Sequence, residues 1–417
     1  MLTPEQNKLL TQVDRGTPAG ELLRRYWHPI AVAQELTDAS PTKFVRVLGE
    51  DLVLFKDKSG NVGLIQDHCA HRGASLLYGR VEERGIACAY HGWLYDTSGN
   101  VLECPAEPAG SMFHLTVKAT AYPVQRLAGL YWAYLGPLPA PALPRYDVLA
   151  QTNGKRRITV FANLDCNWFA AAENAVDPWH LQILHQDQPR SNRRPANTTR
   201  GYVDDIESVE FYMTSFGMMK KRVYKNGKIE EHPTIFPTHL RTGAMWLRTP
   251  MDETHVWQVT VGFEPSEDGS EQTDPLTEEP EVTYLAPIKD PPDAHHPEAR
   301  FNFYAPWGQI LTQDMVVWET QGLISDRPNE RLATSDAGIV MLRELMLQEI
   351  EKVQRGEDPL GVIRDPNHAI IDTNLENEKG RISGIATETV DWRAPGMENV
   401  PAEQLAAGFG GPSFGRY

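Results

Sequence analysis

The chain has 417 residues, with 56 acidic and 40 basic side chains and a formal net charge of −16. This length allows two or three domains with sizeable cores, while the net negative charge and a pI of about 5.3 argue against affinity for nucleic acid or an anionic membrane. No run approaches the ~20 apolar residues of a membrane span, and the N-terminus lacks the basic start and apolar run of a signal peptide. We therefore expect a cytoplasmic protein that does not contact membranes.

The sequence of the N-terminal third predicts a short helical segment followed by β structure. Residues 4–26 are helical in pattern, with Thr3 as the N-cap and Pro4 in the first turn. Residues 28–145 contain short segments rich in β-forming residues, such as 44–48 and 52–56, and end in a Pro-rich connector. We predict a helical segment at 1–27 that packs on the C-terminal domain, an all-β domain at 28–145, and a second domain at 146–417.

The sequence of the second domain predicts both helices and a sheet, so the expected fold class is α+β. A helix is expected at 168–185, and a second helical region at 312–354 with a break near 326–328. Extended segments are expected at 208–218, 239–247 and 255–263, the last two forming a hairpin in a larger antiparallel sheet. Residues 264–281 and 290–297 are acidic, Pro-rich and expected in surface loops.

Four residues have the spacing of a complete metal site: Cys69, His71, Cys88 and His91. Zinc accepts such ligands in a tetrahedral structural site. Here, however, each Cys precedes its His within one loop, and each loop continues into a tight turn. The pattern resembles a Rieske centre, in which two Cys hold one iron and two His hold the other. The remaining Cys104 and Cys166 are expected to be reduced, with no disulfide.

A second constellation contains Asp177, His180 and His185. Positions five apart lie about 140° apart around an unbroken helix, so a helix that ends or bulges between the histidines is needed to bring both to one metal. Asp177 and His180, three apart, share a face. Two imidazoles and a carboxylate form the facial triad of non-haem iron(II) oxygenases. The alternative is a helix C-terminus with polar decoration.

The two patterns together resemble the terminal oxygenase, or alpha component, of Rieske non-haem iron aromatic oxygenases, in particular the phthalate-dioxygenase-like and aromatic O-demethylase branch. The resemblance covers essentially the whole chain. It implies a Rieske [2Fe-2S] domain followed by a catalytic domain in which helices pack on a curved antiparallel sheet, the helix-grip arrangement. It also implies that His180 and His185 bind a mononuclear iron(II), and that Asp177 bridges His91 of one subunit to His180 of the next.

The resemblance places the carboxylate ligand far downstream, and Asp314 matches that position. Glu319 is the main competitor, and less favoured carboxylates, which solvated helix faces would explain, are Asp326, Glu330 and Asp336. Asn174 matches a position near the iron in part of the family, although a structural hydrogen bond would also explain it.

The implied activity uses O2 and electrons from NAD(P)H. Because the chain shows no Gly-rich dinucleotide fingerprint, those electrons are expected to arrive through a separate reductase or ferredoxin. Family members form trimeric rings, so a homotrimer or a multiple of it is expected, with each cluster serving its neighbour's iron.

The expected reaction is monooxygenation of an aromatic acid, including O-demethylation, with cis-dihydroxylation as the runner-up. Arg241 and Arg248 are candidates for binding a substrate carboxylate, with ion pairing inside the protein as the alternative. From another functional class, a Rieske electron carrier or a zinc-stabilised binding module would lack the second iron. Asp177, His180, His185 and Asp314 acting together distinguish the oxygenase.

Overall fold

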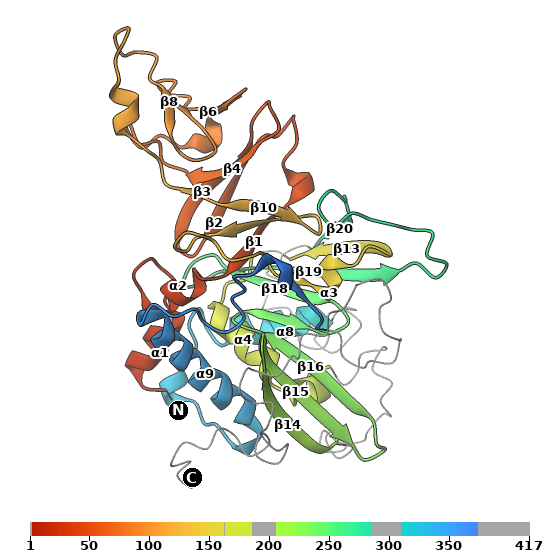
Figure 1. Cartoon of the computed structure of the whole chain (residues 1–417). Helices are drawn as coiled ribbons and strands as arrows, with labels where there is room; N and C mark the ends of the chain where they lie inside the picture. The colour runs from red at the N-terminus through yellow and green to blue at the C-terminus, as the bar shows by residue number, and fades with distance from the viewer. Residues whose placement is uncertain (1, 162, 186–205, 286–309, 374–417) are drawn as a thin grey trace, which may run out of the picture.

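A β-rich N-terminal part sits on one end of a larger part built around an eight-stranded sheet, as the computed structural model shows (Figure 1). The structure describes residues 2–161, 163–185, 206–285 and 310–373. In these ranges no helix is both long and apolar enough to cross a membrane.

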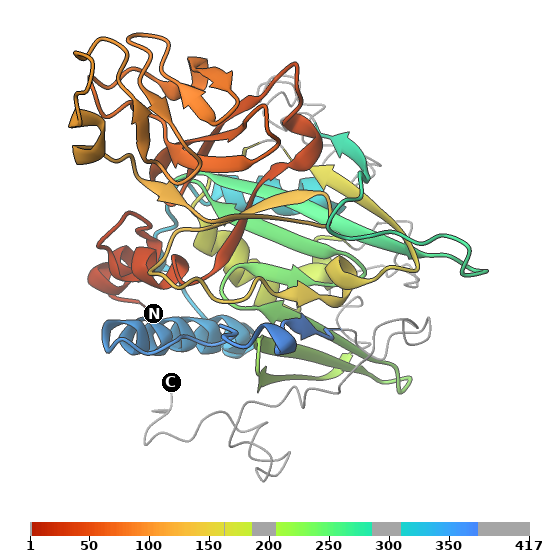
Figure 2. The ribbon, with the colours of Figure 1, turned by 45° about the horizontal axis from the view of Figure 1, so that its top comes forward.

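The chain begins with two short helices instead of the single helical region expected over 4–26. They are α1 (Pro4–Thr11) and α2 (Pro18–Leu23). Thr3 caps α1 in a reciprocal capping box with Gln6, as the N-cap prediction required. The helices are separated because Gly16 adopts a φ of +83° and Thr17 caps a new helix. Helix α2 contacts α9 (Ala337–Gln354), and the two lie side by side in Figure 2.

The N-terminal β part contains two antiparallel sheets of four strands each. In order of pairing, the first contains β2 (Thr42–Val47), β3 (Glu50–Lys56), β4 (Val62–Gln66) and β9 (Ala121–Tyr122). The second contains β5 (Arg80–Glu82), β6 (Gly85–Ala87), β7 (Leu94–Tyr95) and β8 (Val101–Glu103). The strands predicted at 44–48 and 52–56 are confirmed as β2 and β3. In β2, Val45 and Val47 are buried while Phe44 and Arg46 are exposed, as a strand with one buried face requires.

A three-stranded sheet joins the N-terminal β part to the rest of the molecule. It pairs β1 (Trp27–Val32), β11 (Leu130–Tyr134) and β10 (Val124–Leu127). Every residue of β1 and β11 is buried. The hydroxyl of Thr249 donates to the Pro29 carbonyl over 2.6 Å, so β1 is anchored to the large sheet.

The large sheet lies beyond this joint. Its strands, in spatial order, are β14 (Ile206–Thr214), β15 (Gly217–Tyr224), β16 (Ile229–Ile235), β17 (His239–Arg241), β18 (Met245–Pro250), β19 (Val256–Pro265), β13 (Gly154–Val160) and β20 (Glu281–Tyr284). All neighbours are antiparallel except β13 and β20, which are parallel, so the antiparallel expectation is wrong at this edge and the sheet is mixed. The hairpin of β18 and β19 is confirmed.

Two of the predicted extended segments each contain a break. Residues 208–218 include the turn between β14 and β15, and residues 239–247 include a short turn between β17 and β18. The loop predicted at 264–281 reaches the start of β20, whereas 290–297 lies outside the described residues. Beyond the sheet, β12 (Arg145–Tyr146) pairs in parallel with β21 (Ile370–Ile371).

Helices pack against the large sheet. The short α3 (Asp147–Ala150) precedes β13. Helix α4 (Trp168–Val176) contacts β17 and β18 as well as α8 (Ile310–Thr320). The helix expected at 168–185 is in fact two, because α4 ends before Pro178 and α5 (His180–Ile183) follows. Proline lacks the N–H that would continue the helix. Similarly, residues 321–336 separate α8 from α9, a longer interruption than the predicted break.

Candidate functional site

Two loops of matching backbone geometry present the four ligand candidates of the N-terminal β part. One follows β4 and the other follows β6. In the first, the Gly73 N–H donates to the Cys69 carbonyl over 2.8 Å; in the second, the Gly92 N–H donates to the Cys88 carbonyl over 2.9 Å. Both glycines have positive φ, +74° and +72°, a conformation that glycine adopts without strain. The tight turns predicted after each His therefore have a defined role in shaping the loops.

The four candidate ligands lie at different depths, with the cysteines buried and the histidines nearer the surface. Cys69 and Cys88 are each only 3% exposed, while His71 is exposed and His91 is half-buried. The two imidazole rings lie 4.6 Å apart between centroids, and His71 stacks flat on Trp93. This donor set fits a cluster with a thiolate-held iron inside and an imidazole-held iron toward the surface. All four cysteines of the chain are free.

Tyr95 supports this site and was missed as a site residue by the sequence reasoning, which used it only to mark a turn. Its hydroxyl lies 3.1 Å from Cys69 Sγ and accepts the Ala70 N–H, also over 3.1 Å. With its lone pair engaged by that N–H, the hydroxyl proton is available to the sulfur. The available signal was position, because Tyr95 lies in a strand directly after the second loop and its side chain is fully buried.

The second constellation converges at the break between α4 and α5. His185 Nε2 lies 3.2 Å and His180 Nε2 3.8 Å from Asp314 Oδ1. One ligand atom from each of these three residues falls within 4.8 Å of the others, a spacing that three ligands of one ion require. Helix α5 begins at His180 and ends at Ile183, before His185, so the two histidines do not lie on one unbroken helix that would separate them by about 140°.

Neighbouring polar groups orient the three residues. His185 Nδ1 lies 2.8 Å from Gln313 Oε1, so a proton on Nδ1 leaves the Nε2 lone pair for a metal. Asn174 donates to Asp314 Oδ1 over 3.4 Å, so Asn174 lies beside the candidate site. The sequence reasoning missed Gln313, although its position next to Asp314 was a signal.

Asp177 lies against His180, as their spacing predicted. Its Oδ2 is 3.4 Å from His180 Nδ1, and its Oδ1 accepts the Trp179 N–H over 2.8 Å. Burial opposes ionisation of this carboxyl, yet His180 and the Trp179 N–H lower its pKa below the usual value. Asp177 is therefore expected to be ionised at neutral pH.

The competing carboxylates are engaged elsewhere. Glu319 accepts the Asp165 N–H over 2.8 Å. The other three bond to groups away from the histidines: Asp326 to Asn329, Glu330 to Arg343, and Asp336 to the Ala333 N–H. Within the described ranges, Asp314 is the carboxylate grouped with the two histidines.

Both arginines proposed for substrate are buried and have partners within the chain. Arg241 forms an ion pair with Asp147 at 2.8 Å. Arg248 donates to the Gln258 side chain and the Ala171 carbonyl, and its guanidinium lies over the Trp318 ring. Burial lowers the pKa of Arg248 to about 10. These contacts favour the internal alternative for Arg241, and substrate binding by either residue stays a prediction.

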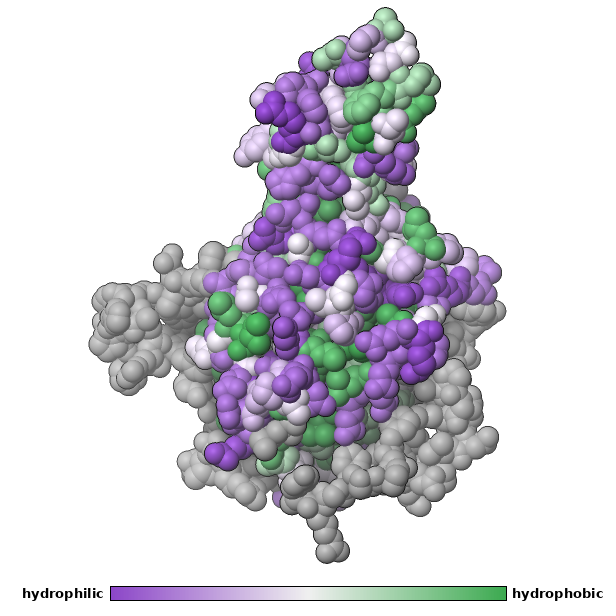
Figure 3. Space-filling view, turned by 90° about the vertical axis from the view of Figure 1, so that its left-hand side faces the viewer, coloured by the Kyte–Doolittle hydropathy of each residue, from purple (hydrophilic) through white to green (hydrophobic). Residues whose placement is uncertain are grey.

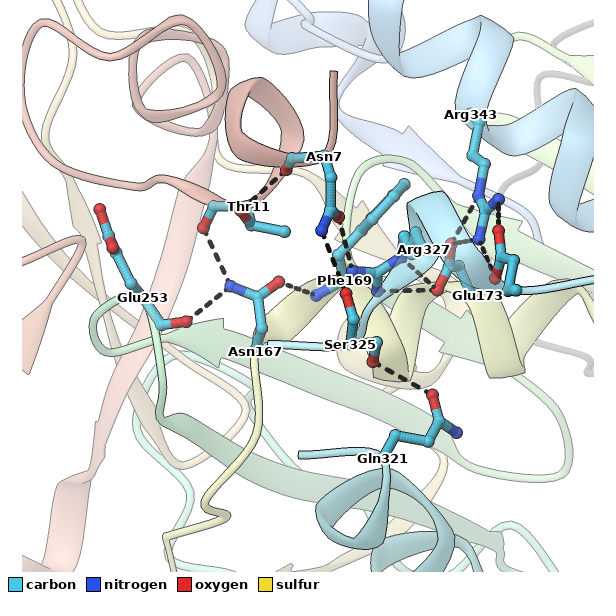
Figure 4. Close-up of polar contacts among 11 residues, drawn as sticks. Asn7, Thr11, Asn167, Phe169, Glu173, Glu253, Gln321, Ser325, Arg327 and Arg343 are labelled. Carbon is cyan, nitrogen blue, oxygen red and sulfur yellow. Dashed lines mark hydrogen bonds and ion pairs between the residues drawn. The ribbon is translucent and has the colours of Figure 1, made fainter. Parts of the chain in front are cut away.

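A buried polar network holds α4 from the side of the N-terminal helices (Figure 4). Glu173 accepts from Arg327 at 2.8 and 2.9 Å and from Arg343 at 2.7 Å. Asn7 of α1 accepts from Arg327 over 3.1 Å. Asn167 caps α4 and donates to the Thr11 carbonyl over 2.9 Å. The sequence offered no local signal for this network, since its members are up to 320 residues apart.

Comparisons with known proteins find similar proteins along almost the whole chain. A model of the Rieske [2Fe-2S] domain matches residues 26–123, and one described as LigXa C-terminal domain like matches residues 302–408. The chain is 39% identical to the oxygenase subunit of 5,5'-dehydrodivanillate O-demethylase from Sphingobium sp., over 98% of this chain and 91% of that one. It is 31% identical to the oxygenase subunit of phthalate 4,5-dioxygenase from Pseudomonas putida, over 94% of each.

A solved structure shares the fold. It is the fluorene-bound oxygenase of carbazole 1,9a-dioxygenase in complex with its ferredoxin, with a TM-score of 0.56 and 20% identity, covering 86% of this chain and 99% of that one. This likeness concerns the fold alone.

Proposed function

The chain belongs to the Rieske non-haem iron oxygenases, as the terminal oxygenase of an aromatic oxygenase system, and we propose that it oxidises an aromatic acid by monooxygenation, O-demethylation included. The family carries a Rieske [2Fe-2S] cluster and a mononuclear iron, and the chain offers donor sets of the right chemistry for both. A Rieske electron carrier, which lacks the second iron, would not belong to this family.

We assign the cluster to Cys69, His71, Cys88 and His91, and the mononuclear iron to His180, His185 and Asp314. The inside-to-outside order of the first set and the convergence of the second support these assignments. When bound, the mononuclear iron supplies the activation of O2 next to the substrate.

The chain's own groups orient these ligands and connect the two centres. Gln313 fixes the tautomer of His185, and Asn174 orients the Asp314 carboxylate. Asp177, ionised and against His180, is proposed as the bridge that accepts a hydrogen bond from His91 of a neighbouring subunit. A carboxylate between two imidazole N–H groups fixes both tautomers and shortens the path for electrons.

The charges around the second site favour an anionic substrate. In the described part of the chain, neither Lys220 nor Arg248 has a carboxylate within ion-pair distance, although Asp177 and Asp314 lie near enough to influence Lys220. When Lys220 is charged, the two positive charges of Lys220 and Arg248 equal the two negative charges of the aspartates. A bound ferrous ion would then give the buried site a net positive charge. A substrate carboxylate would offset that charge, which is costly to bury alone.

The single observation that carries the O-demethylation proposal is the 39% identity to a named O-demethylase subunit along almost the whole chain. An aryl methyl ether, O2, two electrons and two protons would give a phenol, formaldehyde and water. Cis-dihydroxylation is the second candidate, because the phthalate 4,5-dioxygenase subunit matches over 94% of the chain. It would place both oxygen atoms on the ring.

The electrons and the assembly are proposed as follows. A separate reductase or ferredoxin reduces the cluster, and a trimer, or a multiple of it, pairs each cluster with the iron of the next subunit. Within one chain, β6 and β8 lie at the end of the molecule away from α4 and α8 (Figure 1). Hydrophobic side chains gather on that end (Figure 3), where Met112, Phe113 and Leu115 are exposed. Such apolar exposure is typical of protein contacts.

The test begins with iron and sulfide on anaerobically purified protein. We expect about three irons and about two acid-labile sulfides per chain, with a Rieske-type paramagnetic resonance signal after reduction. Zinc without sulfide would contradict the assignment of the first site, and two irons with full sulfide would contradict that of the second.

The reaction is then assayed with a reductase, NADH, and either a methoxybenzoate or phthalate. Formaldehyde released in step with O2 consumption supports O-demethylation. A dihydrodiol that carries both atoms of labelled O2 from phthalate would replace it with cis-dihydroxylation.

A further inference from the structure

Strand β15 turns three polar side chains toward the break between α4 and α5. Because alternate residues of a strand face the same side, Lys220, Arg222 and Tyr224 share one face of β15. We call these three residues the β15 ladder. Lys220 is 5% exposed and Arg222 is fully buried, so their polar groups must find partners inside the protein.

Those partners are the backbone and one side chain of the segment that carries the histidines. Lys220 Nζ donates to the carbonyls of Ala175 and Asp177 over 3.0 and 2.9 Å. Arg222 Nη1 donates to the Pro178 carbonyl over 3.2 Å. Tyr224 Oη accepts from the Gln182 side chain over 3.0 Å. The ladder therefore contacts the segment at four points between positions 175 and 182.

A helix end explains why donors are needed here. The last carbonyls of a helix have no partner within it, and the negative end of the helix dipole favours cations. After Val176 the chain cannot continue helical hydrogen bonding through Pro178. Lys220 and Arg222 supply the missing donors, and they do so where the chain turns from α4 into α5, directly before His180.

The two charged residues of the ladder, Arg222 and Lys220, differ in how their charges are neutralised. Arg222 is balanced by Glu230, 3.0 Å away. Lys220 has no such pair in the described part of the chain, and its charge is opposed from a greater distance by Asp177 and Asp314. Burial, with Arg222 nearby, lowers the pKa of Lys220 to about 7. Either form of the amine can donate to both carbonyls, so the contacts do not depend on its charge.

We propose that the β15 ladder fixes the break between α4 and α5, and that Lys220 is the positioning residue that sets the direction in which Asp177 presents its carboxylate to His180. This inference rests on the proposed function, which gives Asp177 and His180 their roles. Since Lys220 holds the backbone of Asp177 and none of the proposed iron ligands, its loss should disturb the path between the metal centres more than iron binding.

The test replaces Lys220 by Met, which keeps the length of the side chain but donates no hydrogen bond. Lys221→Met is the matched control, because Lys221 lies next in sequence, faces the other side of β15 and pairs with Glu210 at 3.0 Å. Lys220→Arg is the conservative variant that restores donors. For each protein, iron and sulfide are counted, and reoxidation of the pre-reduced cluster is followed by stopped flow after mixing with O2 and substrate.

We expect Lys220→Met to retain its sulfide and most of its iron, while cluster reoxidation slows by at least about tenfold, since small displacements of reacting groups cost large factors in rate. The rates are compared at saturating substrate, because loss of the Lys220 charge also weakens the attraction for a substrate carboxylate, whereas the effect of the ladder is read in kcat. Lys220→Arg should recover much of the rate, and Lys221→Met should match the wild type.

Reoxidation of Lys220→Met at the wild-type rate, or an equal slowing in Lys221→Met, would overturn the proposal. If Lys220→Met fails to fold, Tyr224→Phe removes the contacts of its hydroxyl to Gln182 and Glu230 and should still slow reoxidation; an unchanged rate in that variant would count against the ladder. Failure of the proposed function has a different signature, because the wild type itself would then lack the third iron or fail to couple reoxidation to product.

Discussion

Single side chains determine how each proposed metal centre behaves. In the two loops of the proposed cluster, backbone hydrogen bonds to the Cys69 and Cys88 carbonyls shape the chain, and the Tyr95 hydroxyl reaches the sulfur of Cys69, a proposed ligand. In the second site, Gln313 and Asn174 set the orientation of His185 and Asp314. The protein thus adjusts its metals through neighbouring residues as well as through the ligands.

Replacing Tyr95 by Phe should lower the reduction potential of the cluster. A hydrogen bond to a ligand sulfur stabilises the reduced, more negative form, and a net value of about 0.5–1.5 kcal/mol corresponds to roughly 20–60 mV for one electron. Redox titration followed by paramagnetic resonance measures the shift. Tyr90→Phe is the control, since Tyr90 is 58% exposed beside His91. An unchanged potential in Tyr95→Phe, with the cluster intact, would show that the hydroxyl does not act on the sulfur.

At the scale of elements, α4 is held at both ends. Asn167 ties its N-terminal end to α1. Glu173, in its second half, binds Arg327 from the segment between α8 and α9 and Arg343 of α9. The β15 ladder holds its C-terminal end. This arrangement explains how a nine-residue helix can place histidines beyond its end with a defined geometry. The fixed points come from four different parts of the chain.

Glu173→Gln should destabilise the protein by about 3–5 kcal/mol, because it leaves the buried Arg327 without a carboxylate, whereas Arg343 keeps its pair with Glu330. Thermal or urea unfolding measures the loss. Glu264→Gln provides the comparison, since the Arg157–Glu264 pair is 61% exposed on both sides and such pairs contribute about 0–1 kcal/mol. Equal effects of the two substitutions would contradict the structural role given to the network.

At the scale of the whole molecule, the joint between the two parts contains buried neutral histidines. Burial lowers the pKa of His28, on β1, to about 4 and that of His239, on β17, to about 3, below the usual 6.5. The unfolded chain therefore binds more protons than the folded one between pH 6.5 and 4. Stability should be complete above pH 6.5 and fall as the pH drops through this window.

We expect about 1.4 kcal/mol to be lost per pH unit and per histidine below pH 6.5. Urea midpoints between pH 7.5 and 5.5 test this, and His28→Gln should reduce the slope while retaining a donor for the Leu23 carbonyl. His114, which is only half-buried, serves as the control when replaced by Gln. If His28→Gln leaves the dependence of stability on pH unchanged, protonation of other groups causes the loss of stability.

The proposed assembly leads to a complementation experiment. Asp314→Ala should lose the second iron, Cys69→Ser should lose the cluster, and each protein alone should be inactive. Mixed oligomers of the two should regain up to about a quarter of wild-type turnover, because an intact cluster must fall next to an intact iron by chance. Product formation by the co-expressed, co-purified proteins measures this. No recovery in verified mixed oligomers would contradict electron transfer between subunits.

The sequence alone was enough to propose the candidate ligands that lie close together in the chain. Cys69 and His71, Cys88 and His91, and His180 and His185 are pairs only a few residues apart, so their spacing is readable without a fold. The capping box at Thr3 and the strands β2 and β3 are local for the same reason. The resemblance named Asp314, but spacing could not separate it from Glu319.

Only the tertiary structure determined which distant groups meet. Asp314 lies 129 residues from His185 in sequence, and Lys220 lies 43 residues from Asp177. The partner of Arg241 is Asp147, on an element with no sequence signal of its own. Such contacts depend on how strands and helices pack, and a buried charge takes whichever partner that packing brings within reach. The candidate metal ligands therefore lie mostly in short segments that the sequence reveals, whereas the fold determines which residues orient those ligands.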